Sequence, residues 1–362
     1  MTNLLVTGGA GFIGANFVHH WRRANPSDTI IVLDALTYAG NAANLDGVAD
    51  VELVHGDILD TDLVTRLLTE RAIDSLVHFA AESHVDRSIS GPDAFVETNV
   101  TGTHSLLKAA RAVWLDKGSG RPHRFHHIST DEVYGTLGLD DPAFTEDTAY
   151  APNSPYSASK AGSDHLVRAY HHTYGLDTVT TNCSNNYGPY QFPEKLIPLF
   201  IINALHGRPL PIYGDGMQIR DWLYVEDHCT GISLALTRGK PGETYNIGGG
   251  AELPNLTVIE TLCAAIDSVF AADPSLAARF PDAPAAKGQP TAMLKTHVTD
   301  RPGHDRRYAI DETKARAELG YRAAHGFDVR FRETLGWYLD NEPWWRAVMS
   351  GEYRDWIAKQ YK

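Results

Sequence analysis

Apolar and polar positions alternate in a regular way along the first half of the chain. Short apolar runs, typical of strands buried on both faces, are separated by segments in which apolar residues recur at helical spacing. Alternating strands and helices predict a parallel sheet covered by helices on both faces. We expect strands at 3–7, 29–34, 51–55, 75–79, 124–129 and 177–182, and helices at 12–24, 60–71, 93–115 and 157–174.

The pattern changes after about residue 187. Prolines interrupt short segments there, and loops separate the helices expected at 257–270 and 311–319. Residues 270–290 are rich in Ala and Pro and predict a loose surface insertion. We therefore expect two domains: a first domain at 1–187 and a smaller, irregular α/β domain at 188–362, with segments such as 222–246 packing back on the first.

The chain has 362 residues and a formal net charge of −13. This balance argues against binding to nucleic acid or to an anionic membrane. The three cysteines are scattered without metal-ligand spacing, which is typical of reduced thiols in a cytosolic protein. We expect no signal peptide and no apolar run that spans a bilayer. Adjacent His pairs such as His126-His127 indicate surface or capping positions, so we expect no metal site.

A glycine-rich turn joins the first strand to the first helix. Its glycines, Gly8, Gly11 and Gly14, allow a tight turn, a close approach to a pyrophosphate and close packing of the helix. Asp34 ends the second strand, where a carboxylate accepts the ribose hydroxyls of NAD and repels the 2′-phosphate of NADP. The alternative is a turn and a cap without a ligand. The combination predicts a Rossmann-type NAD-binding domain with further contacts at Asp57, Ile58, Ala80 and Ala81.

Tyr156 and Lys160 lie one turn apart on the helix that follows the fifth strand. A lysine ammonium beside a phenol lowers the pKa of the tyrosine, which can then act as a base. The alternative is an aromatic core residue with a solvated lysine. The position of Thr130 at the end of the fifth strand favours the catalytic interpretation.

Asp131 and Glu132 follow Thr130 directly. A solvated acidic turn is the ordinary interpretation of two adjacent acids in a loop. These two acids stand at the carboxyl end of a strand, in a row expected to face the nicotinamide. Paired carboxyl groups with separated pKa values can serve as acid and base in one site. A plain dehydrogenase or epimerase does not need such a pair, whereas an enzyme that expels water does.

Motifs are dispersed over nearly the whole chain: TGGAGFIG at 7–14, LTYAGN at 36–41, AAESHVDRS at 80–88, STDEVYG at 129–135, YSASK at 156–160, NNYGPY at 185–190, FPEKL at 192–196, PIYGDG at 211–216, RDW at 220–222 and DRPGHDRRY at 300–308. In these motifs the chain resembles the extended short-chain dehydrogenase/reductase family, which includes NAD-dependent epimerases and dehydratases. Within it, the chain is similar to the dTDP-glucose 4,6-dehydratases of deoxysugar biosynthesis. Only the loop at 270–289 departs, because it is longer than the family pattern.

The resemblance implies a redox-neutral lyase reaction. Tyr156 would take the proton of the glucose 4-hydroxyl, held by Thr130, while NAD removes hydride from C4. Glu132 would take the C5 proton, and Asp131 would protonate the departing 6-hydroxyl. Hydride would return to C6, giving dTDP-4-keto-6-deoxyglucose, so the cofactor would stay tightly bound.

The resemblance also implies ligand contacts and a homodimer, formed by the helices at 93–115 and 157–174 with their twofold mates. Cofactor contacts would include Phe12, Ile13, Leu36, Thr37, Ser83, Thr98, Tyr156, Lys160 and Asn186. Substrate contacts would include Ser83, Thr130, Asn185, Glu194, Lys195, Leu196, Pro211, Tyr213, Arg220, Asn255, Asp300, Arg301 and His304.

Other functions fit part of the sequence. A UDP-sugar 4-epimerase would share the NAD site and the Tyr156–Lys160 pair but would not need the acid pair. A 4,6-dehydratase for another nucleotide-glucose would share every motif, because the choice of thymidine as the base of the substrate is implied only by the resemblance. A non-catalytic NAD-binding regulator would be expected to have a degraded Tyr-Lys pair.

Overall fold

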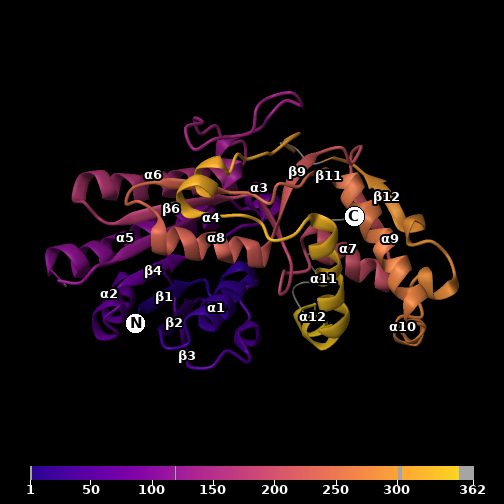
Figure 1. The fold of residues 1–362 in the computed structure, drawn as a ribbon, viewed down its shortest axis with the longest axis horizontal. Coiled ribbons are helices and arrows are strands. Elements are labelled where there is room, and N and C mark those ends of the chain that lie inside the picture. The colour runs from indigo at the N-terminus through magenta and orange to yellow at the C-terminus, as the bar shows by residue number, and fades with distance from the viewer. Residues whose placement is uncertain (1, 119, 301–303, 350–362) are drawn as a thin grey trace.

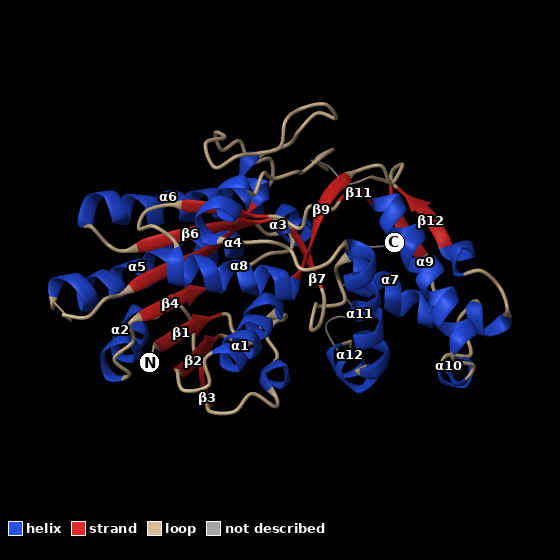
Figure 2. Cartoon of the chain, viewed as in Figure 1, coloured by secondary structure: helices blue, strands red, loops and turns tan. Residues whose placement is uncertain are grey.

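The computed structural model describes residues 2–118, 120–300 and 304–349. A helix-covered sheet forms one side of the molecule, and a smaller group of helices with short strands forms the other (Figure 1). Helices flank the sheet, as Figure 2 shows. The predicted fold class is confirmed.

Seven strands form the main sheet, and every neighbouring pair is parallel. Six of them are the predicted strands. The seventh comes from the second half of the chain and extends the edge beside β6. The order is β3 (Val51–His55), β2 (Thr29–Asp34), β1 (Asn3–Thr7), β4 (Ser75–His78), β5 (Arg124–Thr130), β6 (Thr178–Cys183) and β10 (Thr244–Ile247).

Alternate residues of the central strands enter separate cores, because successive side chains of a strand point to opposite faces. Leu4 and Val6 pack against α1 (Phe12–Ala24) and α8 (Val225–Arg238). Leu5 packs on the other face, which is covered by α2 (Thr61–Glu70), α5 (Thr103–Arg111) and α6 (Pro155–Tyr174).

The helix expected at 93–115 is not uniform. It begins as α4 (Asp93–Phe95), continues through a π-helical segment, Val96–Gly102, and passes through α5 into a second π-helical segment, Ala112–Asp116. π-helical turns inside α-helices are frequent at functional sites. The first of them carries Thr98 and the buried Asn99.

The rest of the chain builds a second core. Its helices are α7 (Leu196–Leu205), α9 (Asn255–Ala272), α10 (Ser275–Arg279), α11 (Phe327–Asp340) and α12 (Glu342–Val348). Two further helical segments lie outside this core. The α3 helix (Val85–Ser90) follows β4, and the expected helix at 311–319 contains the π-helical segment Ala315–Leu319. The small sheets are β11 (Glu252–Pro254), β9 (Ile219–Tyr224) and β7 (Asn185–Tyr187), and β12 (Lys295–Val298) with β8 (Leu210–Tyr213).

Three sequence-based expectations are wrong. Residues 270–290 are not a loose insertion, because Leu276, Phe280 and Ala283 are buried in the second core. We expected no apolar run long enough to span a bilayer, but α9 is long and apolar enough by length and composition. Its buried face packs into the second core. The His126-His127 pair is fully buried in β5 rather than at the surface. No group of three metal-ligating side chains is found among the described residues. His127 is hydrogen-bonded to the single carboxylate of Asp164.

Candidate active site

The glycine turn has little room for side chains. Gly8 has a φ of +69°, and a Cβ there would lie 2.6 Å from the backbone nitrogen of Ala80. A Cβ on Gly14 would lie 2.3 Å from the Gly8 carbonyl oxygen. The first turn of α1 therefore sits directly on the strand end, with its free N–H groups at the carboxyl edge of the sheet.

Asp34 lies beside this turn. Its carboxylate oxygens accept hydrogen bonds from the backbone nitrogens of Ala10, at 2.9 Å, and Leu36, at 2.8 Å. Burial raises the pKa of Asp34, and these two bonds oppose the rise. Each carboxylate oxygen has a further lone pair for a ribose hydroxyl. The cramped glycine turn and this acid fit a dinucleotide.

Most of the other predicted cofactor contacts follow the carboxyl ends of the parallel strands. Leu36, directly after β2, has a φ of +50°. The candidates follow successive elements: Phe12 and Ile13 begin α1, Leu36 and Thr37 follow β2, Asp57 and Ile58 follow β3, Ala80, Ala81 and Ser83 follow β4, Thr98 lies in the first π-helical segment, and Asn186 lies in β7.

Tyr156 and Lys160 stand in the first turns of α6. A reciprocal Ser154–Ser157 capping box and Pro155 fix the start of this helix. Both side chains are buried, and the Lys160 ammonium donates to the Ile128 carbonyl oxygen at 2.8 Å. Burial and the negative charge of Glu132 raise the pKa of Tyr156. The predicted lowering of the tyrosine pKa is therefore wrong.

A buried polar network lies beneath this pair. Asp164, one turn beyond Lys160, accepts hydrogen bonds from Ser129 at 2.8 Å and Tyr150 at 3.0 Å, and its other oxygen lies 3.0 Å from His127 Nε2. Burial raises the pKa of Asp164 to about 6. Burial lowers the pKa of Lys160, and the nearby Asp164 carboxylate opposes that change.

Thr130, Asp131 and Glu132 occupy the turn from β5 into the short 3₁₀ helix Asp131–Tyr134. The Thr130 hydroxyl accepts from the Glu132 backbone nitrogen at 3.3 Å. Asp131 is buried, and its pKa is raised by burial and by the charges of Glu132 and Asp221. Desolvation therefore favours a protonated Asp131, which lies beside the less buried Glu132.

A cavity of about 180 Å³ opens in front of this turn. Its wall contains Glu132 from the sheet side and many predicted substrate contacts from the second half. These contacts are Asn185, Glu194, Lys195, Leu196, Pro211, Tyr213, Arg220, Asn255 and His304. Ser83, Thr130 and Asp300 are not among its lining residues, and Arg301 lies outside the described residues.

Arg220 enters the cavity from β9 and is nearly fully buried. Its guanidinium donates to the Asp305 and Ile219 carbonyl oxygens and stacks on Tyr308, with 4.3 Å between the guanidinium carbon and the ring centroid. The adjacent Asp221 accepts from the backbone nitrogens of Gly249 and Ala251. Arg220 is therefore a buried residue of the cavity wall and not a surface arginine.

Asp300 lies behind the cavity wall and contacts one of the residues that line it. One of its carboxylate oxygens lies 2.6 Å from His304 Nδ1, and the other accepts from the Gln218 side chain at 2.9 Å. His304 in turn contacts the edge of the Tyr213 ring. Asp300 thus positions the two cavity residues predicted to lie near the nucleoside.

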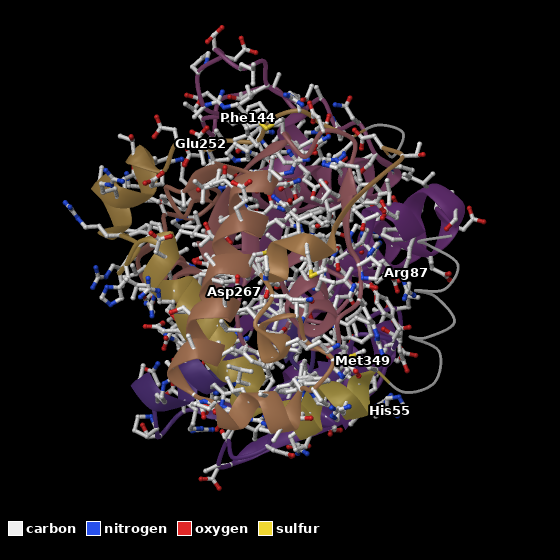
Figure 3. All side chains as sticks on the ribbon, turned by 90° about the vertical axis from the view of Figure 1, so that its right-hand side faces the viewer. His55, Arg87, Phe144, Glu252, Asp267 and Met349 are labelled. Atoms are coloured by element: carbon white, nitrogen blue, oxygen red, sulfur yellow. The ribbon has the colours of Figure 1, made fainter. Side chains whose placement is uncertain are left out.

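Glu194 is buried at the junction of the two halves, and burial raises its pKa. Its Oε2 atom lies 3.4 Å from Arg87 Nη2, and the Arg87 guanidinium covers the Tyr38 ring. Arg87 is labelled near the edge of the molecule in Figure 3. Lys195 crosses the same junction, donating to the Ser83 carbonyl oxygen at 3.2 Å.

Sequence reasoning did not assign several residues of the cavity. His84 and Asp86 belong to a motif that was recognised, so their spacing was a usable signal. The apolar residues come from α7, β8, β9 and α9, and no local pattern separates them from core positions. They are Leu199, Phe200, Ile212, Trp222 and Ile259.

Comparison with known proteins settles the family. A family model described as GDP-mannose 4,6 dehydratase matches residues 5–334. A dTDP-glucose 4,6-dehydratase from Xanthomonas campestris is 55% identical over 359 residues, which cover 98% of each chain. The chain belongs to the dTDP-glucose 4,6-dehydratase family. The predicted recognition is confirmed.

Solved structures agree with this family. The dTDP-glucose 4,6-dehydratase DesIV from Streptomyces venezuelae, with NAD bound, has a TM-score of 0.84 and 47% identity, covering 96% of this chain and 100% of its own. A UDP-glucose 4-epimerase from Thermotoga maritima has a TM-score of 0.80 but 25% identity, covering 94% of this chain and 100% of its own. The fold is common to both activities, and the identity favours the dehydratases.

Proposed function

We propose that this member of the dTDP-glucose 4,6-dehydratase family converts dTDP-glucose to dTDP-4-keto-6-deoxyglucose with a tightly bound NAD. The observation that carries the proposal is the acid pair at the end of β5, in which the buried Asp131 has a raised pKa beside Glu132 in the cavity wall. An epimerase or a plain dehydrogenase has no step for these two acids. Full-length identity to relatives of that name supports the choice.

NAD, when bound, accepts a hydride from C4 of the sugar and returns it to C6. The protein would hold the pyrophosphate of NAD at the start of α1, beside the glycine turn of residues 8–14, and would hold a ribose with Asp34. The remaining cofactor candidates around the strand ends complete that site.

The proton transfers would be carried by residues of β5 and α6. Tyr156 takes the proton of the 4-hydroxyl, and Thr130 hydrogen-bonds the same oxygen. Once C4 is a ketone, the C5 proton is acidic, and Glu132 removes it. Asp131 protonates the 6-hydroxyl, which leaves as water. Glu132 returns its proton to C5 when hydride is returned to C6, and proton exchange through solvent takes the extra proton from Tyr156 and restores that of Asp131. Lys160, held against the Ile128 carbonyl one turn from Tyr156, would offset part of the rise in the pKa of Tyr156 that burial and Glu132 cause.

The second half of the chain would hold the nucleotide. Arg220 is the charge-assisted contact for the diphosphate, because its planar guanidinium offers paired donors. Tyr213, Asn255, His304 and the loop at 300–304 would contact the nucleoside, while Asn185, Glu194 and Lys195 would contact the sugar or phosphates. Thymidine as the base follows from the family relatives.

A cytoplasmic homodimer is part of the proposal. The expected interface is formed by the helical segments around 93–116 and by α6. Exposed Val96 in the first segment and Ile89 of the neighbouring α3 support it, since their side chains are about half exposed in the single chain, at 54% and 46%. The oligomeric state in solution would test this part separately.

The direct test is to incubate the purified protein with dTDP-glucose and to follow product mass. Loss of one water supports the dehydratase. An unchanged mass with inverted stereochemistry at C4 supports an epimerase. NAD binding without turnover of any nucleotide sugar supports a non-catalytic regulator. A panel of dTDP-, UDP-, GDP- and CDP-glucose then decides which base the second half accepts.

A further inference from the structure

A chain of hydrogen bonds connects the C-terminal helix to the glycine turn. Trp344 of α12 donates its indole N–H to Asn44 Oδ1 at 2.7 Å. Asn44 donates its amide to the Ala10 carbonyl oxygen at 2.8 Å. The Ala10 backbone nitrogen donates to Asp34 Oδ2 at 2.9 Å. Trp344 and Asn44, which are 300 positions apart, are thus bonded directly, and the Asn44 side chain links Trp344 to Ala10.

Asn44 is held on every side. It is 1% exposed and lies in a short 3₁₀ turn, Ala42–Leu45. Its backbone nitrogen donates to the Asn41 carbonyl at 2.9 Å, and its carbonyl oxygen lies 2.9 Å from His19 Nε2. Both ends of its side-chain amide are engaged as well, one with Ala10 and the other with Trp344. The Asn44 side chain is therefore a direct link between α12 and the glycine turn.

The Trp344 end of this series of hydrogen bonds packs on the second core. Trp345, adjacent to Trp344, is 1% exposed, and its indole donates to the Tyr338 carbonyl oxygen at 2.8 Å. The Trp344 ring itself packs against Trp337 of α11, with 5.1 Å between centroids, and against Tyr190, with 5.8 Å. The helix that reaches Asn44 is therefore packed on the core of the half that lines the substrate cavity.

We propose that Trp344 and Asn44 are positioning residues that keep the cofactor bound during turnover. This inference rests on the proposed function. A hydride taken from C4 must return to C6 of the same sugar, so loss of the reduced cofactor in mid-cycle ends catalysis. By tying the Ala10 and Asp34 region to the C-terminal half, the two residues make opening of the cofactor site depend on separation of the halves.

The test compares Trp344→Phe with Trp337→Phe. The first removes the indole donor and keeps an aromatic ring; the second alters a neighbouring ring that is outside the hydrogen-bond chain. We measure the NAD content of the purified proteins and the rate at which bound NAD exchanges with labelled NAD in solution. Trp344→Phe should exchange NAD about tenfold faster, because one buried acceptor loses its donor. The KM for dTDP-glucose should stay within about twofold of the wild-type value.

Added NAD should restore the activity that Trp344→Phe loses. The inference is overturned if Trp344→Phe exchanges NAD at the wild-type rate, or if both variants accelerate exchange equally, which would indicate aromatic packing alone. Wild-type protein that holds no NAD and dehydrates no nucleotide sugar would instead overturn the proposed function. The two failures are thus distinguishable.

A second measurement needs no variant. Amide hydrogen exchange of the wild-type protein is followed with and without NAD. The amides of residues 8–14 and those of α12 should gain protection together when NAD binds. Protection confined to residues 8–14 would show that α12 is not coupled to the cofactor site, and would overturn the inference.

Discussion

The residues proposed for the chemistry and those proposed for the nucleotide differ in their exposure to water. On the sheet side, behind the cavity wall, Thr130, Asp131, Tyr156 and Lys160 are all buried. On the other side, Arg220 is buried too, but Tyr213, Asn255 and His304 are only partly buried and come from separate elements of the second half. In the proposed function, the chemistry therefore lies where desolvation changes pKa values, and most of the nucleotide contacts lie nearer the surface.

Removing the base on the sheet side should have the largest effect. Tyr156→Phe retains the ring but cannot take the 4-hydroxyl proton, so kcat should fall about 10³- to 10⁴-fold, at the upper end of the range for general-base catalysis. Tyr170→Phe, on the same helix but away from the cavity, is the matched control. Single-turnover reduction of NAD measures the step, and wild-type reduction in Tyr156→Phe would remove this residue from the chemistry.

On the second side, the stability of the protein should be sensitive to substitutions in the second core. Phe280→Ala should lower the free energy of unfolding by about 3–5 kcal/mol, because the ring is 2% exposed in the second core. Met293→Ala, at a position 59% exposed, should change it by less than about 0.5 kcal/mol. Chemical denaturation measures both. Equal small effects would mean that residues 270–290 are the loose insertion that their composition predicted.

The buried network beneath the sheet side should appear in the pH dependence of stability. Asp164 has a pKa of about 6 in the folded protein, against a usual value of 3.8, so the folded state binds more protons between these pH values. The contribution of Asp164 to stability is therefore present below pH 4 and is lost as the pH rises to 6. The loss is roughly 3 kcal/mol, at 1.36 kcal/mol for each pKa unit.

Asp164→Asn removes this titration. As the pH rises from 4 to 7, the wild-type protein should therefore lose roughly 3 kcal/mol of stability relative to the variant. The quantity measured is the difference between the two free energies of unfolding. A difference that is constant with pH would contradict the raised pKa.

The smallest effect should come from the nucleotide contact. Arg220→Lys keeps the charge but loses the paired donors, so kcat/KM should fall by roughly 10- to 50-fold, or about 2 kcal/mol, mostly through KM. Arg306→Lys, at an exposed ion pair with Asp215, is the control. A fall in kcat at unchanged KM would place Arg220 with the chemistry and remove the proposed division between the two sides.

The sheet side was the more predictable from sequence. Strand periodicity and the glycine turn predict the order of elements, and parallel strands place Gly8, Asp34 and Thr130 at one edge whatever the side chains do elsewhere. The burial of individual polar side chains could not be predicted as well as the order of the elements. His126, polar by type, is fully buried, and the pKa of Tyr156 is raised because the site is desolvated.

The second side was predictable mainly through family motifs. Arg220, Asn255 and His304 lie in separate segments that only the tertiary fold brings together. Composition was misleading at Phe280, where an Ala- and Pro-rich segment packs into a core. The bond between Trp344 and Asn44 also joins distant segments, and no local pattern signals it.

The central claim is that Asp131 and Glu132 specify dehydration after oxidation at C4. The most direct measurement uses Glu132→Gln and dTDP-glucose carrying deuterium at C4. The account predicts that deuterium is transferred to NAD and that no water is lost, whereas the wild-type protein delivers deuterium to C6 with loss of water. Loss of water by Glu132→Gln at the wild-type rate would contradict it.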